Sequence, residues 1–329
     1  MKLQWISATT LSAIRLIREI HAANHFHAGG SADDVALASD LAEPVAILHE
    51  RLISESIAPQ PFWTCLIEEI ISEDRDVPLA PARIEVAVLR AGGSQLQSDQ
   101  TAAALSRQIR RCTRHIGEQH PRWAEQLKLR YAPMKQAFQA YGPGLMRGIG
   151  RRIWNGEPPS DWWPERVAVH AVSPIHRGAG DLSNLTTSLW IEAVLTDMDP
   201  AVPEWLRLAY LLTRVATNTH TRTHRTSESS DMPTSESGPG ELPWDWGMIP
   251  LVLDQAIQLG VLPSQTPPIR MATSMWLDPY QDPIVSENID ALETWWEDVG
   301  RQAGILPPAL KRLTTMLTTA THKSAQSNR

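Results

Sequence analysis

The amino-acid sequence predicts an α+β protein that is predominantly helical and contains a small antiparallel sheet. Hydrophobic residues make up 42% of the 329 residues and charged residues 20%, a composition typical of globular rather than disordered chains. Most of the chain repeats its apolar residues every three or four positions, which indicates helices. Only residues 83–90, 166–172 and 188–195 alternate with a period of two, which predicts three strands.

The first helices follow from apolar faces near the N-terminus. Residues 7–21 and 33–57 each carry such a face, and the glycine pair Gly29-Gly30 between them favours a helix end. A third helix is expected over residues 61–72, because prolines precede it and suit the first helical turn.

The strands at 166–172 and 188–195 are expected to form an antiparallel hairpin. The connection between them, residues 173–187, has too little helical pattern for the crossover that joins parallel strands. The segment 83–90, closed by a glycine pair, is expected to complete one small sheet with them.

The remaining helices follow from the same helical spacing. A helix near 105–116 is followed by a second run after Pro121, which Pro133 should interrupt and Gly142-Pro143-Gly144 should end. Further helices are expected over residues 203–216, 249–260, 287–303 and 308–320.

The chain divides by composition into three parts. Residues 1–216 form a helix-rich α+β domain, and residues 217–243, rich in Thr, Ser, Glu, Pro and Gly, form a disordered linker or insertion. Residues 244–329 form a C-terminal helical segment, which either packs on the first domain or stands apart.

Charge is distributed unevenly along the chain. Residues 100–152 hold eleven basic and two acidic side chains, whereas the protein as a whole carries a formal charge of −7. Within this block Arg107, Arg110, Arg111 and Arg114 make a stripe at helical spacing. The stripe could bind a polyanion such as nucleic acid, or dock on the protein's own acidic segments, which the acidic overall charge favours.

The connection at 173–187 is the leading candidate for a ligand site. It contains His176, Arg177, Gly178, Gly180 and Asp181. The glycines would let backbone amides approach an anion, and the other three side chains could supply acid–base or charge roles. A glycine-bearing turn with solvated polar residues explains the same pattern, because GxG lacks a strand-to-helix context here.

Two histidine pairs have the spacing of metal ligands. His21 and His25 are four residues apart, as are His220 and His224. The glutamate of an HExxH motif is absent, so histidines that interact with helix ends are the favoured interpretation, and no metal or cofactor is expected. A strand pair could also bring His170 and Glu192 face to face, as a structural contact.

Cysteine and tryptophan complete the set of informative residues. Cys65 and Cys112 lie in apolar helical patterns, which favours buried thiols in a reducing compartment. The 13 tryptophans include adjacent indoles, as in Trp162-Trp163, Trp295-Trp296 and the spaced pair Trp244 and Trp246. Most should pack in the core, and those left exposed would suit contacts with a partner.

Residues 141–216 carry a partial resemblance to known sequences. The runs Tyr141–Leu145, Ser188–Leu195 and Pro203–Leu212 together resemble a group of uncharacterised bacterial proteins of unknown function. The resemblance implies that the predicted hairpin and the helix after it form one structural unit, and it implies no activity.

The leading functional hypothesis is a non-enzymatic binding or scaffold protein whose partner is another protein. The alternative is a metal-dependent or hydrolase-like enzyme that uses the 173–187 connection, and the third is a nucleic-acid binder that uses the basic helices at 107–130. The N-terminus indicates an amphipathic helix rather than a signal peptide, and no apolar run is long enough to span a membrane, so a cytoplasmic protein is expected.

Overall fold

The computed structural model describes residues 1–22, 32–175, 178–228, 243–263, 266–277, 286–303 and 307–327. It confirms a predominantly helical α+β protein with a small four-stranded sheet. The strands are β1 (Lys2–Ser7), β2 (Arg166–Val172), β3 (Gly180–Leu182) and β4 (Ser188–Glu192). The helices are α1 (Thr9–Ala22), α2 (Ala32–Ser54), α3 (Pro59–Ile71), α4 (Pro81–Arg90), α5 (Ser98–Gln119), α6 (Trp123–Trp154), α7 (Glu204–Glu228), α8 (Trp244–Gln258), α9 (Ile269–Trp276), α10 (Ser286–Trp295), the π-helical turn η1 (Trp296–Gly300), α11 (Arg301–Ala303) and α12 (Pro307–Ser327).

The sheet is mixed, with strand order β1-β2-β4-β3. Strands β1, β2 and β4 are mutually parallel, and β3 runs antiparallel to β4. The predicted hairpin between 166–172 and 188–195 is therefore wrong, since those segments pair in parallel. The hairpin partner of β4 is β3, whose three residues are too short to show a period, and β3 returns the chain so that β4 enters beside β2 in the same direction.

The predicted strand at 83–90 is also wrong, because these residues form helix α4. Ile84, Ala87 and Val88 are buried at helical spacing, while Leu89 is exposed. A short apolar run satisfies both periods. Pro81 suits the first turn of a helix, and contacts of Ile84 and Val88 with the core select the helix. The sequence analysis missed two strands, β3 and β1, and β1 pairs with β2 along its whole length.

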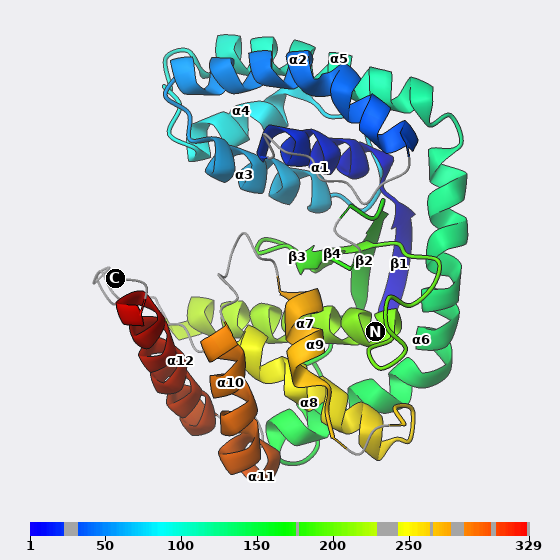
Figure 1. Ribbon diagram of the computed structural model, residues 1–329, viewed down its shortest axis with the longest axis vertical. Coiled ribbons are helices and arrows are strands. Elements are labelled where there is room, and N and C mark those ends of the chain that lie inside the picture. The colour runs from blue at the N-terminus through cyan, green and yellow to red at the C-terminus, as the bar shows by residue number, and fades with distance from the viewer. Residues whose placement is uncertain are drawn as a thin grey trace.

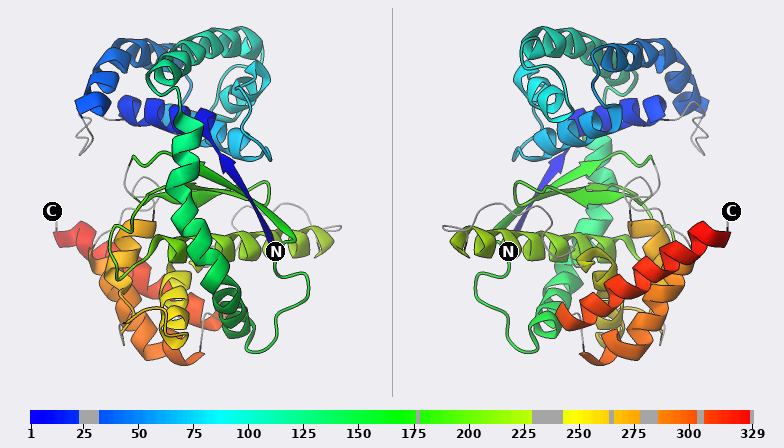
Figure 2. Two further views of the ribbon diagram at one scale, coloured as in Figure 1. Left: turned by 90° about the vertical axis from the view of Figure 1, so that its right-hand side faces the viewer. Right: turned by 90° about the vertical axis from the view of Figure 1, so that its left-hand side faces the viewer.

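Helix α6 continues through both of its prolines, which corrects the predicted interruption at Pro133 and the predicted end at Gly142-Pro143-Gly144. Proline removes one backbone donor, but tertiary packing of Phe138, Leu145 and Ile149 offsets this cost. A side chain at Gly142 would collide with the Phe138 ring, so this glycine serves close packing rather than a turn. Figures 1 and 2 show α6 running along one side of the molecule from α5 to the lower helices.

The sheet separates two hydrophobic cores. Its Ala168 and Val172 belong to the core made by α1 to α5, whereas Val167 and Val169 on its other face belong to the core made by α6 to α12. Figure 1 shows the first group of helices above the sheet and the second group below it. The helices after residue 244 share their core with α6 and α7.

The predicted linker at 217–243 is partly helical. Helix α7 extends to Glu228, twelve residues beyond position 216. The threonine hydroxyls at 217, 221 and 223 each donate to the carbonyl four residues earlier, so these polar groups find partners within the helix. The rest of the predicted linker, up to residue 242, lies outside the described residues. Among the helices described, none is long and apolar enough to cross a membrane.

Candidate functional site: the groove between α2 and α5

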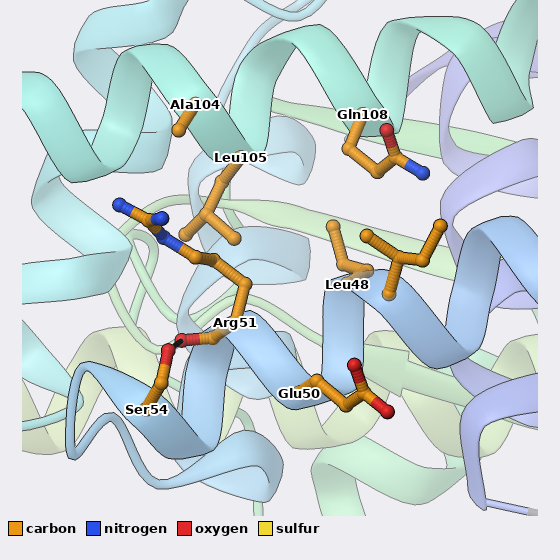
Figure 3. A pocket seen from close by; sticks show the side chains of 8 residues that line it. Leu48, Glu50, Arg51, Ser54, Ala104, Leu105 and Gln108 are labelled. Atoms are coloured by element: carbon orange, nitrogen blue, oxygen red, sulfur yellow. Dashed lines mark hydrogen bonds between the residues drawn. The ribbon is translucent and has the colours of Figure 1, made fainter.

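An open groove of about 450 Å³ lies between α2 and α5 on the surface of the upper helices (Figure 3). The two helices pack side by side, and Gln108 Nε2 donates a hydrogen bond of 3.1 Å to the carbonyl of Pro44. Leu48 and Leu105 are buried at the base of the groove, and Ile47 is 45% exposed at its rim. Its lining consists of Ile47, Leu48, Glu50, Arg51, Ser54, Ala104, Leu105 and Gln108.

The helical period explains why these residues share a groove. On α5 the buried face carries Leu105, Ile109 and Cys112, which leaves Ala104 and Gln108 at the edge of that face. Ala104 is small, so α5 leaves space where a longer side chain would fill the gap. Figure 3 shows Arg51 extending from α2 towards Ala104 and Leu105.

The wall of the groove formed by α5 is basic. Arg107, Arg110, Arg111 and Arg114 are all exposed. Arg107 and Arg111 lie three and seven residues after Ala104, so both are on the groove side of the helix. Within the part of the chain that the structure describes, none of the four forms an ion pair with a carboxylate, so the predicted docking on the protein's own acidic segments is not seen there.

The wall formed by α2 is acidic. Asp40, Glu43 and Glu50 are exposed. Asp40 lies seven residues before Ile47, Glu43 four before it and Glu50 three after it, so all three share its face of the helix. Asp40 lies 3.6 Å from His115 of α5, and Arg51 of α2 pairs with Glu55, one residue beyond the end of α2. The groove therefore has an apolar base between walls of opposite charge.

The 173–187 connection is anchored from inside by Glu192. One oxygen of this carboxylate accepts hydrogen bonds from the amides of Gly178 and Ala179, at 2.9 and 3.2 Å. The other accepts from the amide of Ile175 at 3.0 Å and from Arg15 Nη2 at 2.7 Å. The backbone amides that the sequence analysis offered to a ligand anion thus bind the protein's own carboxylate.

Burial alone would raise the pKa of the Glu192 carboxyl, which is fully inaccessible to solvent. The charge of Arg15 and the hydrogen bonds from Gly178 and Ile175 outweigh burial and lower this pKa to about 2. Arg15 is itself buried, lies 3.9 Å over the Trp190 ring and donates to the carbonyl of Ser173. One ion pair therefore joins α1, β4 and the connection.

Other residues of the connection also have internal partners. Asp181 pairs with Arg214, which makes two further hydrogen bonds of 2.7 Å to Asp245. Gly180 packs where a side chain would meet Leu211 and the carbonyl of Trp190. His176 and Arg177 lie outside the described residues.

A second buried ion pair supports the same segment. Arg207 pairs with Glu204 one turn away on α7 and donates to the carbonyls of Ala179 and Glu192. Burial raises the pKa of the Glu204 carboxyl, against the lowering effect of Arg207. The Arg15–Glu192 and Arg207–Glu204 pairs therefore position α1 and α7 against the end of β4 and the connection.

The remaining sequence candidates are separated in space or buried. His170 does not face Glu192, because its Nε2 lies 3.0 Å from the carbonyl of Glu73 and its neighbour across the strands is Trp190. His21 meets His49, whereas His25 lies outside the described residues. Burial raises the pKa of the Cys112 thiol to about 11, which keeps it protonated at neutral pH. Trp162, Trp246, Trp295 and Trp296 are buried.

Comparison of the chain with models of protein families, with curated proteins and with solved structures found no match. The resemblance of residues 141–216 to uncharacterised bacterial proteins therefore stays a prediction. Among the described residues, no group of three or more histidine, cysteine, aspartate or glutamate side chains is placed to hold a metal ion. Sequence reasoning did not find the groove, although the helical spacing of the four arginines beside it was evident in the sequence.

Proposed function

We propose that this chain is a non-enzymatic binding protein whose α2–α5 groove holds an amphipathic helix of a partner protein. The observation that carries the proposal is an open apolar groove with a basic wall on one side and an acidic wall on the other. A helix laid between two helices buries its apolar face on the groove base, at positions i, i+3, i+4 and i+7.

Charge complementarity defines the partner further. Arg107 and Arg111 along α5 attract acidic side chains on one flank of the bound helix, and Glu43 and Glu50 along α2 attract basic side chains on the other. Such a pattern also sets the direction of the bound helix, because reversing the helix would place like charges together.

A nucleic acid fits this surface less well. Its phosphates would gain contacts with the four arginines, but they would also approach Asp40, Glu43 and Glu50 across the groove. The groove base is apolar, and a phosphate backbone does not bury leucine and isoleucine side chains.

The enzyme alternative has less support in the described structure. The connection at 173–187 uses its amides at Ile175, Gly178 and Ala179 to hold Glu192, and its Asp181 to hold Arg214. Because these groups already hold the connection in place, they favour the binding function over a catalytic role for the connection.

The test places a photo-crosslinking amino acid at Ala104 and identifies the crosslinked residues by mass spectrometry in cells of the source organism. The expected product is a protein segment whose sequence has apolar residues at helical spacing and acidic residues on one flank. A crosslink to nucleic acid, or to a second copy of this chain, would contradict the proposal, as would a segment without that pattern.

The second stage measures the affinity of the identified segment, as a synthetic peptide, for charge-reversed variants. Arg107→Glu combined with Arg111→Glu should weaken binding at least about tenfold, because attraction on the basic wall becomes repulsion. The matched control is Arg130→Glu combined with Arg147→Glu, which makes the same charge change at exposed positions of α6. Equal affinity of both double variants would reject the groove as the binding site.

A further inference from the structure

The two imidazole rings of His21 and His49 meet between helices α1 and α2. His21 lies in the last turn of α1, and its Nε2 is 2.5 Å from Nδ1 of His49. The ring centroids are 4.4 Å apart, and the edge of the His21 ring packs against Trp63, with centroids 5.8 Å apart. Two nitrogen atoms from different helices therefore face one another in a supported arrangement.

The facing nitrogens of His21 and His49 are ring atoms of the kind that bind metal ions in proteins. A neutral imidazole keeps a lone pair on one ring nitrogen, and that form is the metal ligand. A metal ion would replace the hydrogen atom that otherwise sits between the two facing nitrogens.

We propose that His21 and His49 together bind one late first-row transition-metal ion of the zinc and copper class. Ligand bonds to zinc of about 2.0–2.1 Å would place two tetrahedral nitrogen ligands about 3.3 Å apart, somewhat further than they are here. His49 is exposed, so its ring has room to turn by this amount, and water fills the remaining positions. Imidazole pairs suit zinc, copper and nickel, whereas calcium and magnesium prefer oxygen ligands.

Bound metal would join the end of α1 to the C-terminal part of α2. Because the site exists only when the two helices are packed, the metal stabilises the folded protein by linkage. Helix α2 also forms one wall of the groove, yet the metal site is argued from its own contacts and does not depend on the proposed partner.

The experiment titrates Zn²⁺ and Cu²⁺ into chelator-treated protein by calorimetry and records the Tm with and without Zn²⁺. The expected result is one ion per chain and a Tm that rises with Zn²⁺, with no response to Mg²⁺. His49→Ala removes an exposed ligand and should weaken Zn²⁺ binding at least about tenfold, since binding by two linked groups becomes binding by one. It should also abolish the Tm rise.

Two controls separate this site from other histidines. His120→Ala should bind Zn²⁺ as the unaltered chain does, and so should His224→Ala, which removes one member of the other histidine pair at helical spacing. Electron paramagnetic resonance of the Cu²⁺-loaded unaltered chain should show coupling to two imidazole nitrogens, a readout that needs no variant. Unchanged binding by His49→Ala, loss of binding in His224→Ala, or a copper spectrum without imidazole nitrogen would overturn the proposal.

Discussion

The Glu192→Ala variant is expected to lose about 3–5 kcal/mol of folding free energy, the range typical when one partner of a buried ion pair is removed. The change leaves the Arg15 guanidinium buried without its carboxylate, and it leaves the amides of Ile175, Gly178 and Ala179 without their acceptor. Urea unfolding followed by circular dichroism at neutral pH measures this loss.

The stability of the unaltered protein should also depend on pH through the same carboxyl. The folded-state pKa of Glu192, about 2, lies below its ordinary value of 4.5, so the stabilisation is fully present above pH 4.5. It is lost as the pH falls from about 4.5 to about 2, and the full shift corresponds to about 3 kcal/mol. Glu192→Gln should lack this contribution, so the difference in stability between the two chains should shrink across that range.

The control for both measurements is Glu157→Gln. Glu157 pairs with Arg151 on the surface, where an ion pair contributes about 0–1 kcal/mol. A loss at Glu192 no larger than the loss at Glu157 would show that the connection at 173–187 is not held by the buried carboxylate.

The Trp295→Ala variant is expected to lose about 3–5 kcal/mol, as large-to-small changes of buried tryptophan do. Trp295 is fully buried between α10 and α12, and its Nε1 donates a hydrogen bond of 2.8 Å to the carbonyl of Ala309. The helices after residue 244 share a core with α6 and α7, so the variant should destabilise α7 as well as α12. Hydrogen exchange should show the slowest amides of α7 and α12 losing protection together.

Trp295→Phe is the matched comparison, because it keeps an aromatic ring while it removes the indole donor and part of the ring volume. It should cost about 1–2 kcal/mol, the range for a lost hydrogen bond and a small change in packing. If α12 lost protection in Trp295→Ala while α7 kept it, residues 244–329 would behave as a separate folding unit.

Much of the helical structure was predictable because a helix with a wide apolar face repeats apolar residues every three or four positions in the local sequence. Leu11, Ile14 and Ile17 of α1 are fully buried at the predicted spacing, and so are Leu105 and Ile109 of α5. The same period placed the four arginines of α5 on a different face from the apolar residues. That this face is exposed to solvent comes from the structure. These features depend on residues one or two turns apart.

The direction of the sheet and the secondary structure of short segments were not predictable in this way. Residues 84–89 are apolar enough for either period, and contacts of Ile84 and Val88 with the core select the helix. The three residues of β3 carry no period, yet they decide that β2 and β4 run parallel.

Local periodicity was enough to predict the set of helical faces, the arginine stripe at helical spacing on α5 and the predominantly helical class. Which of these faces pack against one another follows from the tertiary structure. Arg15 pairs with Glu192 across 177 positions, His21 meets His49 across 28, and Ile47 meets α5 at the groove. Such contacts depend on how distant segments pack, and the periodicity of one helix does not say which other segment will contact its apolar face.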